Sequence, residues 1–200
     1  MTSAHKPTPR ILLLPGWLNS DPAHWQSRWE HLHGHRRVEQ DDWVWPRRGD
    51  WMARLDEVLL ESEVPAVLVA HSLGCQLVAA WAAHSRHTAR VQAALLVAPP
   101  DTERDDMPPN LFSWRPIERT RLAFSGGPSG GAANAVRVTP HVVCSDDDPF
   151  CSAENAASMA AAWGCALTCI GHHGHINAES GLGDWPQGLA LLAGLIADAD

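Results

Sequence analysis

Side chains that could act together in catalysis lie in three short segments of this sequence. Ser72 follows one apolar run, the acidic cluster Asp146–Asp148 follows a second, and the histidine-rich loop His172–His175 follows a third. A serine hydroxyl is a weak nucleophile that needs a base to take its proton, and the base needs a carboxylate to fix its tautomer. The three segments therefore hold the parts of an activated serine nucleophile.

The residues around Ser72 are typical of a strand, a sharp turn and a helix. Residues 66–70 form an unbroken apolar run, as expected of a buried parallel strand, and a helical pattern of small residues begins at Leu73. The motif Gly-x-Ser-x-Gly marks a nucleophile elbow, and here Ala70 stands at its first glycine. We expect Ser72 at the carboxyl end of the sheet, with the Leu73 N–H directed at a developing oxyanion.

The rest of the chain alternates short apolar runs with helical periodicity, which predicts one parallel sheet with helices on both faces, a three-layer α/β architecture. Six strands are expected, in the spatial order 2-1-3-4-5-6. They lie at residues 11–14, within 38–43, and at 66–70, 91–98, 141–144 and 165–170. Three helices are expected to be capped, the first by Ser20 or Asp21, the others by Asp50 and by Ser152. Two more are expected to begin at Leu73 and near Trp185. Trp25, Trp29 and Leu32 form the apolar stripe of the first helix.

The carboxyl ends of parallel strands meet at one edge of a sheet, where functional groups collect. The chain order serine, aspartate, histidine is the order of the α/β-hydrolase fold, in which the loop after the first strand supplies a second oxyanion N–H. Pro15-Gly16-Trp17 occupies that loop here. These chemical considerations leave open which aspartate of 146–148 and which histidine of 172–175 takes part.

Size and charge limit the function further. The 200 residues fit one domain, 1–200, without a second domain or large cap, and residues 125–135 form a Gly/Ser-rich segment expected to be a flexible loop. The net charge of −8 disfavours a nucleic-acid partner, and no apolar run approaches the roughly 18–20 residues that span a membrane. A polar amino terminus that is no signal peptide predicts a cytoplasmic location.

Five short motifs are spread over most of the chain: Leu-Pro-Gly-Trp at 14–17, His-Trp at 24–25 with Trp29, His-Ser-Leu-Gly at 71–74, Asp-Pro-Phe at 148–150 and Gly-His-Ile-Asn at 174–177. Together they resemble the family of small α/β-hydrolases that includes retinoblastoma-binding protein 9 and the bacterial YdeN proteins.

This resemblance implies specific residues for the acid and the base. The family acid directly precedes a proline, which makes it Asp148, with Asp146 as the fallback. The family base follows a glycine, which makes it His175, with His173 as the fallback. Ser72, Asp148 and His175 are therefore the expected catalytic residues.

The oxyanion hole that the resemblance implies consists of the backbone N–H groups of Leu73 and Trp17, with Leu18 as the alternative to Trp17. The substrate pocket is less defined. Its candidate residues are Leu18, His71, Phe112 and Trp114, and the segment 99–140 is the candidate lid.

One property associated with the family does not carry over. The retinoblastoma-binding motif Leu-x-Cys-x-Glu has its nearest counterpart at residues 167–171, where Gly171 replaces the glutamate. A retinoblastoma-type partner is therefore not expected. Residues 125–135 also depart from the family pattern.

The sequence thus predicts a serine hydrolase that cleaves a small-molecule ester or amide, most simply as a carboxylesterase, with no cofactor, no metal and no membrane partner. Two alternatives stay open. A protein with this fold could bind a ligand with little turnover, or the loop His172–His175 could hold a catalytic metal, because imidazole suits zinc.

Overall fold

The computed structural model describes residues 8–124 and 138–199, so the predicted loop at 125–135 lies outside the described residues. Its six strands form one parallel sheet in the order β2-β1-β3-β4-β5-β6, which confirms the predicted order. The strands are β1 (Arg10–Leu14), β2 (Arg36–Arg37), β3 (Ala66–His71), β4 (Val91–Val97), β5 (His141–Cys144) and β6 (Ala166–Cys169).

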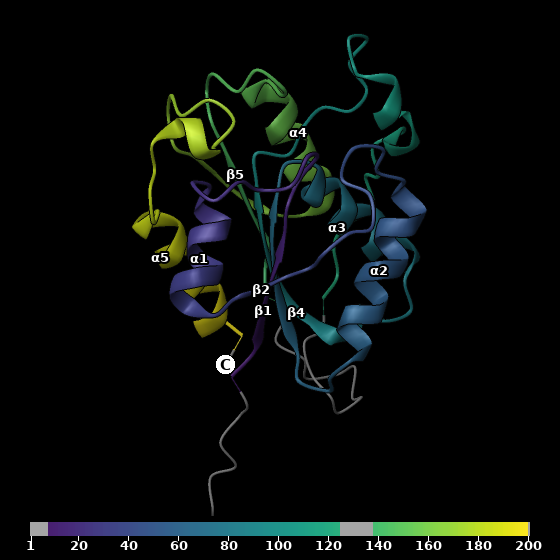
Figure 1. Cartoon of the computed structure of the whole chain (residues 1–200), viewed down its shortest axis with the longest axis vertical. Helices are drawn as coiled ribbons and strands as arrows, with labels where there is room; N and C mark the ends of the chain where they lie inside the picture. Colours follow the sequence, from purple (N-terminus) through teal and green to yellow (C-terminus); the bar gives the residue numbers. More distant parts are fainter. Residues whose placement is uncertain (1–7, 125–137, 200) are drawn as a thin grey trace, which may run out of the picture.

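Helices cover both faces of this sheet, as predicted (Figure 1). On one face lie α1 (Trp25–His33) and α5 (Pro186–Ala197), and on the other α2 (Arg48–Leu60), α3 (Leu73–His84) and α4 (Ala153–Trp163). Short 3₁₀ helices cover Thr88–Arg90, Pro109–Trp114 and Ala178–Ser180. The architecture is a three-layer α/β sandwich.

A separate hydrophobic core fills each side of the sheet. Along β3 the side chains alternate, so that Val67 and Val69 pack toward α1 and α5 while Leu68 and Ala70 pack toward α2, α3 and α4. Seven tryptophans are almost fully buried, and each large ring buries about 150–250 Å². They are Trp25, Trp29, Trp51, Trp81, Trp114, Trp163 and Trp185.

The second strand is shorter and earlier than predicted. It consists of Arg36 and Arg37, paired with Leu12 and Leu13, and not of a segment within 38–43. An edge strand pairs on one side only, and edge strands are often short and charged. Val38 continues the contact by donating its N–H to the Leu13 carbonyl.

The first helix also begins later than predicted. Its N-cap is His24, whose Nδ1 accepts the N–H of Gln26 at 3.1 Å. Asp21 instead caps the preceding turn, accepting the N–H groups of Ala23 and His24 at 2.7 and 3.0 Å. In an Asx turn, as in a helix cap, an aspartate side chain accepts main-chain N–H groups, so the sequence alone does not distinguish the two.

Two smaller differences concern α1 and α2. Leu32 is 52% exposed and does not extend the buried stripe of Trp25 and Trp29. Asp50 lies in the first turn of α2, whose N-cap is Arg47. The remaining predicted strand ends agree within one residue, which is the ordinary scatter of such boundaries.

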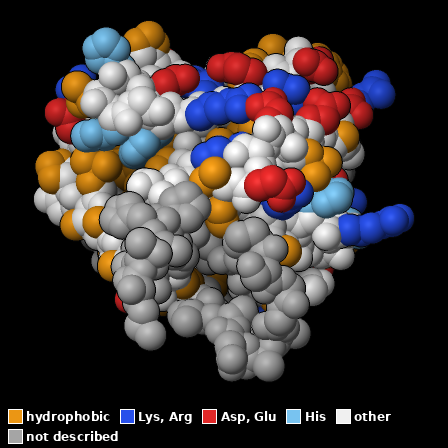
Figure 2. Space-filling model, turned by 90° about the horizontal axis from the view of Figure 1, so that it is seen from below, with side chains coloured by type: hydrophobic (Ala, Val, Ile, Leu, Met, Phe, Trp, Pro, Cys, Tyr) orange, Lys and Arg blue, Asp and Glu red, His pale blue; other side chains and the backbone are white. Residues whose placement is uncertain are grey.

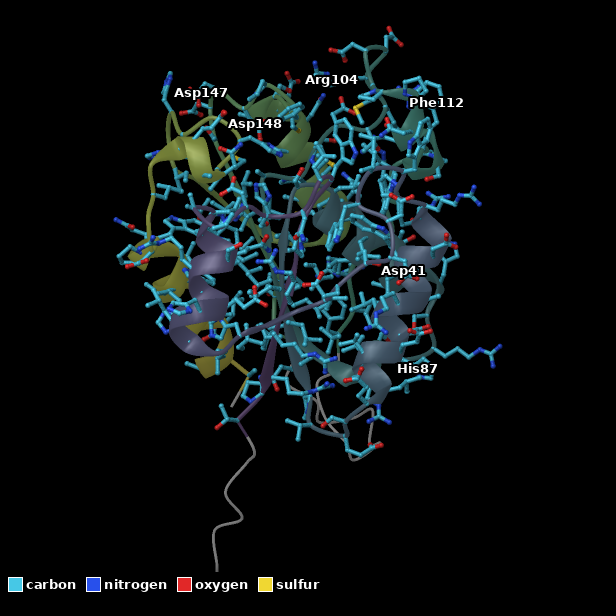
Figure 3. The ribbon with its side chains drawn as sticks, viewed as in Figure 1. Asp41, His87, Arg104, Phe112, Asp147 and Asp148 are labelled. Carbon is cyan, nitrogen blue, oxygen red and sulfur yellow. The ribbon has the colours of Figure 1, made fainter. Side chains whose placement is uncertain are left out.

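The two ends of the sheet differ in character. Figure 2 shows the amino end from below, with basic and acidic side chains side by side. Asp147 and Asp148 lie at the opposite end, where the strands finish (Figure 3). Within the described residues, no helix has the length and apolar character to cross a bilayer.

Candidate active site

Ser72 occupies a strained turn between β3 and α3. Its φ of 53° and ψ of −125° are unusual for a residue with a side chain, and such a conformation costs about 1–3 kcal/mol. The turn is held on both sides, because the Ser72 N–H donates to the Val97 carbonyl at 2.9 Å and its carbonyl accepts from Cys75 N at 2.8 Å. This geometry places the hydroxyl above the edge of the sheet.

Two glycines make room for the turn. A Cβ on Gly16 would lie 2.6 Å from the Cβ of Ser72, and a Cβ on Gly74 would lie 2.2 Å from the Leu14 carbonyl oxygen. The methyl group of Ala70, by contrast, is accommodated in the core. The close approaches thus occur at Gly16 and Gly74, which explains how the elbow forms with alanine at the first glycine position.

The structure brings Ser72, His175 and Asp148 together in one chain of hydrogen bonds. His175 Nε2 lies 2.8 Å from Ser72 Oγ, and Nδ1 lies 3.0 and 2.9 Å from the two carboxylate oxygens of Asp148. A carboxylate only accepts, so Nδ1 carries the proton and Nε2 is the acceptor facing the serine hydroxyl. The side chains of His175 and Asp148 are largely buried, with exposed fractions of 9% and 3%. These distances are within the range required for proton transfer.

Side-chain hydrogen bonds join the acid loop after β5 to the base loop after β6. Asp147 Oδ1 accepts the Gly174 N–H at 2.8 Å and the Ser145 hydroxyl at 2.7 Å. The same hydroxyl oxygen accepts the His173 N–H at 3.0 Å. The bond from the Ser145 hydroxyl, and then the bond from the Gly174 N–H, lower the pKa of Asp147. The buried Ser145 was not predicted, since a serine before an acidic turn resembles an ordinary loop residue.

The fallback residues have other partners. Asp146 Oδ1 lies 2.9 Å from Cys169 Sγ, and the His173 N–H donates to Ser145. His172 is exposed, with Nδ1 3.9 Å from Asp147 Oδ2. Across residues 8–124 and 138–199, no three His, Cys, Asp or Glu side chains lie close enough to share a metal ion. The three histidines of the loop therefore do not converge on one point.

Two backbone N–H groups are suited to an oxyanion. Leu73 is the first residue of α3, and the N–H groups of a first helical turn have no acceptor within the helix. In the loop after β1, the Leu18 N–H donates to the Trp43 carbonyl at 3.1 Å. The Leu18 N–H thus already has an acceptor, and Trp17 stays the expected second donor.

A cavity of about 310 Å³ lies over the serine and contains Ser72 and His175 in its wall. Leu18 and His71 also line it. Trp114 does not, because it is 1% exposed in the core, with its ring 5.3 Å from that of Trp51. Placing Trp114 in the pocket was therefore wrong.

Phe112 does not line this cavity either. Its ring is 49% exposed at the carboxyl-end edge, where it contacts the Arg115 guanidinium at 4.8 Å (Figure 3). The apolar character of Phe112 did not reveal on which side of its short helix it lies.

Several residues of the cavity wall were not predicted. Met107, Pro108 and Leu111 come from the segment after β4, and the Phe150 ring lies 4.6 Å from the His175 ring. The segment after β4 was expected over the active face, but no periodicity singles out its contact residues. The polar part of the wall includes Asn19, Asp21, His24 and Asn177.

Two buried histidines adjoin the site. Burial lowers the pKa of His24 to about 4. Burial, and then the neighbouring His24 and His175, lower the pKa of His71 well below its ordinary value. Both rings are therefore neutral at pH 7.

Comparison with known proteins agrees with this arrangement. The family model described as serine hydrolase matches residues 11–194. A YdeN-like hydrolase of Pectobacterium atrosepticum is similar in structure, with 26% identity and a TM-score of 0.76 over 95% of this chain and 91% of that one. A search of curated protein sequences found no match.

Two further structures share the fold. The ydeN gene product of Bacillus subtilis has 20% identity and a TM-score of 0.69 over 95% of this chain and 100% of that one. A carboxylesterase of Bacillus cereus has 17% identity and a TM-score of 0.52 over 85% of this chain and 82% of that one. At these identities the likeness concerns the fold alone.

Proposed function

The chain belongs to the serine hydrolase family, and we propose that it hydrolyses a carboxylic ester or amide through an acyl intermediate on Ser72. The observation that carries this proposal is the continuous hydrogen-bond chain from Ser72 Oγ through His175 to Asp148, at 2.8 and 2.9–3.0 Å. Ser72 and His175 also lie in the wall of the cavity of about 310 Å³.

In the proposed reaction, His175 Nε2 takes the proton of the Ser72 hydroxyl as the oxygen attacks the substrate carbonyl. The N–H groups of Leu73 and Trp17 stabilise the tetrahedral oxyanion. His175 then gives its proton to the leaving alcohol or amine. Water repeats the sequence on the acyl-enzyme, which releases the acid and restores Ser72. Asp148 holds the imidazole in the required tautomer throughout.

The cavity supports a small substrate. Its volume of about 310 Å³ lies at the lower end of the range of about 300–1,000 Å³ that small-molecule sites occupy. The wall formed by Met107, Pro108, Leu111 and Phe150 is apolar. Together these features favour a short, uncharged acyl group and an activity of the carboxylesterase type.

The direct test is hydrolysis of p-nitrophenyl esters of graded chain length, beside aminoacyl amides, by the wild-type protein and by Ser72→Ala. We expect activity that is highest for short acyl chains, and a loss of about 10⁴-fold or more in Ser72→Ala. Ser158→Ala, an exposed position on α4, is the matched control and should retain full activity.

If Ser72→Ala kept most of the activity, the proposed mechanism would be wrong. Slow hydrolysis of every ester and amide, with Ser72 still reactive toward a covalent probe, would favour a binding protein with little turnover. If a chelator abolished the activity of the wild-type protein and Ser72→Ala remained active, the metal-dependent alternative would be favoured.

A further inference from the structure

His71 directly precedes Ser72 at the end of β3, yet its side chain contacts the loop that carries the base. It is 5% exposed. Its ring centroid lies 4.9 Å from that of His175 and 4.6 Å from that of His24. The side chain thus links the strand of the nucleophile to the base loop 104 residues farther along the chain.

The link is a hydrogen bond to the main chain. His71 Nε2 lies 2.8 Å from the carbonyl oxygen of His175. A carbonyl oxygen only accepts, so Nε2 must carry the hydrogen. Because the ring is neutral at pH 7, it supplies this donor without placing a second positive charge beside the imidazolium that forms on His175 during the reaction.

The backbone that His71 holds is strained at the next residue. Ile176 has a φ of 49°, a region that β-branched residues rarely occupy, so neighbouring contacts must maintain it. Trp25 Nε1 donates to the Ile176 carbonyl at 2.8 Å. The two consecutive carbonyls of His175 and Ile176 are therefore each fixed by a buried ring N–H. The His175 carbonyl belongs to the peptide that leaves the Cα of His175, so the bond from His71 bears directly on the main chain that carries the imidazole.

We propose that His71 is a positioning residue, whose ring N–H fixes the main chain of His175 and so keeps its Nε2 within reach of the Ser72 hydroxyl. The inference rests on the proposed function, since it assigns His71 a role in the same reaction. It also changes the expected role of His71, which lines the cavity but acts on the base and not on the substrate.

The test compares His71→Leu, which fills similar space without a donor, with His71→Gln, whose side-chain amide places an N–H at about the same distance along the chain. A misplacement of about 1 Å costs about 100-fold in rate. We therefore expect His71→Leu to lower kcat by about 10- to 100-fold with little change in KM. His71→Gln should recover most of that loss.

Val78→Ala is the matched control. Val78 is buried in α3 and does not line the cavity over Ser72. This variant should lose stability, measured by thermal unfolding, without a comparable loss of kcat.

Two outcomes would overturn the inference. Equal kcat in His71→Leu, His71→Gln and the wild type would show that the hydrogen bond does not position His175. If both variants lost kcat equally, and in proportion to the fraction of protein that is unfolded, the role of His71 would be purely structural. In either case Ser72→Ala would still abolish activity, whereas failure of the proposed function would leave Ser72→Ala active.

Discussion

The nucleophile and the base reach the same site by different physical means. Ser72 lies between a strand and a helix that are almost wholly buried, and its position is set by main-chain geometry and two close glycine contacts. His175 lies on a loop after β6, an edge strand that is mostly exposed, and its position is set by hydrogen bonds. The nucleophile side is thus fixed by packing and the base side by polar contacts.

This difference indicates which substitutions each side tolerates. Around Ser72, a change of volume should matter more than a change of polarity, because interiors are close-packed. Around His175, removal of a single donor or acceptor should matter even when the volume is preserved.

The largest effect on the base side is expected from Asp148→Asn. An amide in place of the carboxylate no longer holds the Nδ1–H tautomer of His175, and loss of that tautomer costs about 10⁴-fold in kcat. Asp146→Asn and Asp147→Asn are the controls, measured with the same ester, and should cost about tenfold or less, because neither carboxylate contacts the imidazole of His175. A loss in Asp146→Asn as large as that in Asp148→Asn would show that the acid has been assigned wrongly.

On the nucleophile side, Gly74→Ala should be the most damaging change of volume. The new Cβ would lie 2.2 Å from the main-chain oxygen of Leu14, which cannot move aside as a side chain can. We expect a loss of at least about 3 kcal/mol in the free energy of unfolding, measured by denaturant titration of tryptophan fluorescence.

Gly49→Ala gives the contrast. Gly49 lies in α2, where a Cβ would have no atom within 4 Å, so alanine should stabilise the helix by up to about 1 kcal/mol. Equal effects of the two substitutions would contradict the packing account of the elbow.

Acidification should weaken the fold through His24. Burial lowers its pKa from 6.5 to about 4, so below pH 6.5 the unfolded chain binds a proton that the folded protein does not. Stability then falls as the pH falls from 6.5 to about 4, by about 3 kcal/mol for this residue. His24→Asn keeps an acceptor for the helix cap but does not titrate. Its free energy of unfolding should therefore decline less over this window, and identical declines would refute the assignment.

The smallest effect is expected from Ala70→Gly, which restores the usual first glycine of the elbow. Glycine within a strand costs about 1 kcal/mol in conformational entropy, and the methyl group of Ala70 is buried in the core. Stability should fall by about this amount with unchanged kcat/KM. A several-fold rise in kcat/KM would show that Ala70 strains the elbow.

The sheet order could be predicted from the sequence because every buried strand is a short apolar run between turn residues. The residues of β2 could not be predicted, since Arg36 and Arg37 lie at an edge and carry no apolar pattern. The start of α1 was missed for a different reason, because Asp21 caps a turn with the chemistry that also caps a helix.

Within the site, chain order and motif spacing led to Ser72, Asp148 and His175, whose side chains the structure brings together. The pocket residues were less predictable. Trp114 and Phe112 lie on one short helix, and only tertiary packing decides that the first is buried in the core and the second exposed. Catalytic roles, single-domain organisation and a cytoplasmic location stay predictions.

The most direct test of the account is covalent labelling with a fluorophosphonate, followed by peptide mass spectrometry. The proposed mechanism predicts one phosphonyl adduct, on Ser72, that is lost in Ser72→Ala and forms far more slowly in His175→Ala. An adduct on another residue, or none on Ser72 in a protein that still hydrolyses esters, would contradict it.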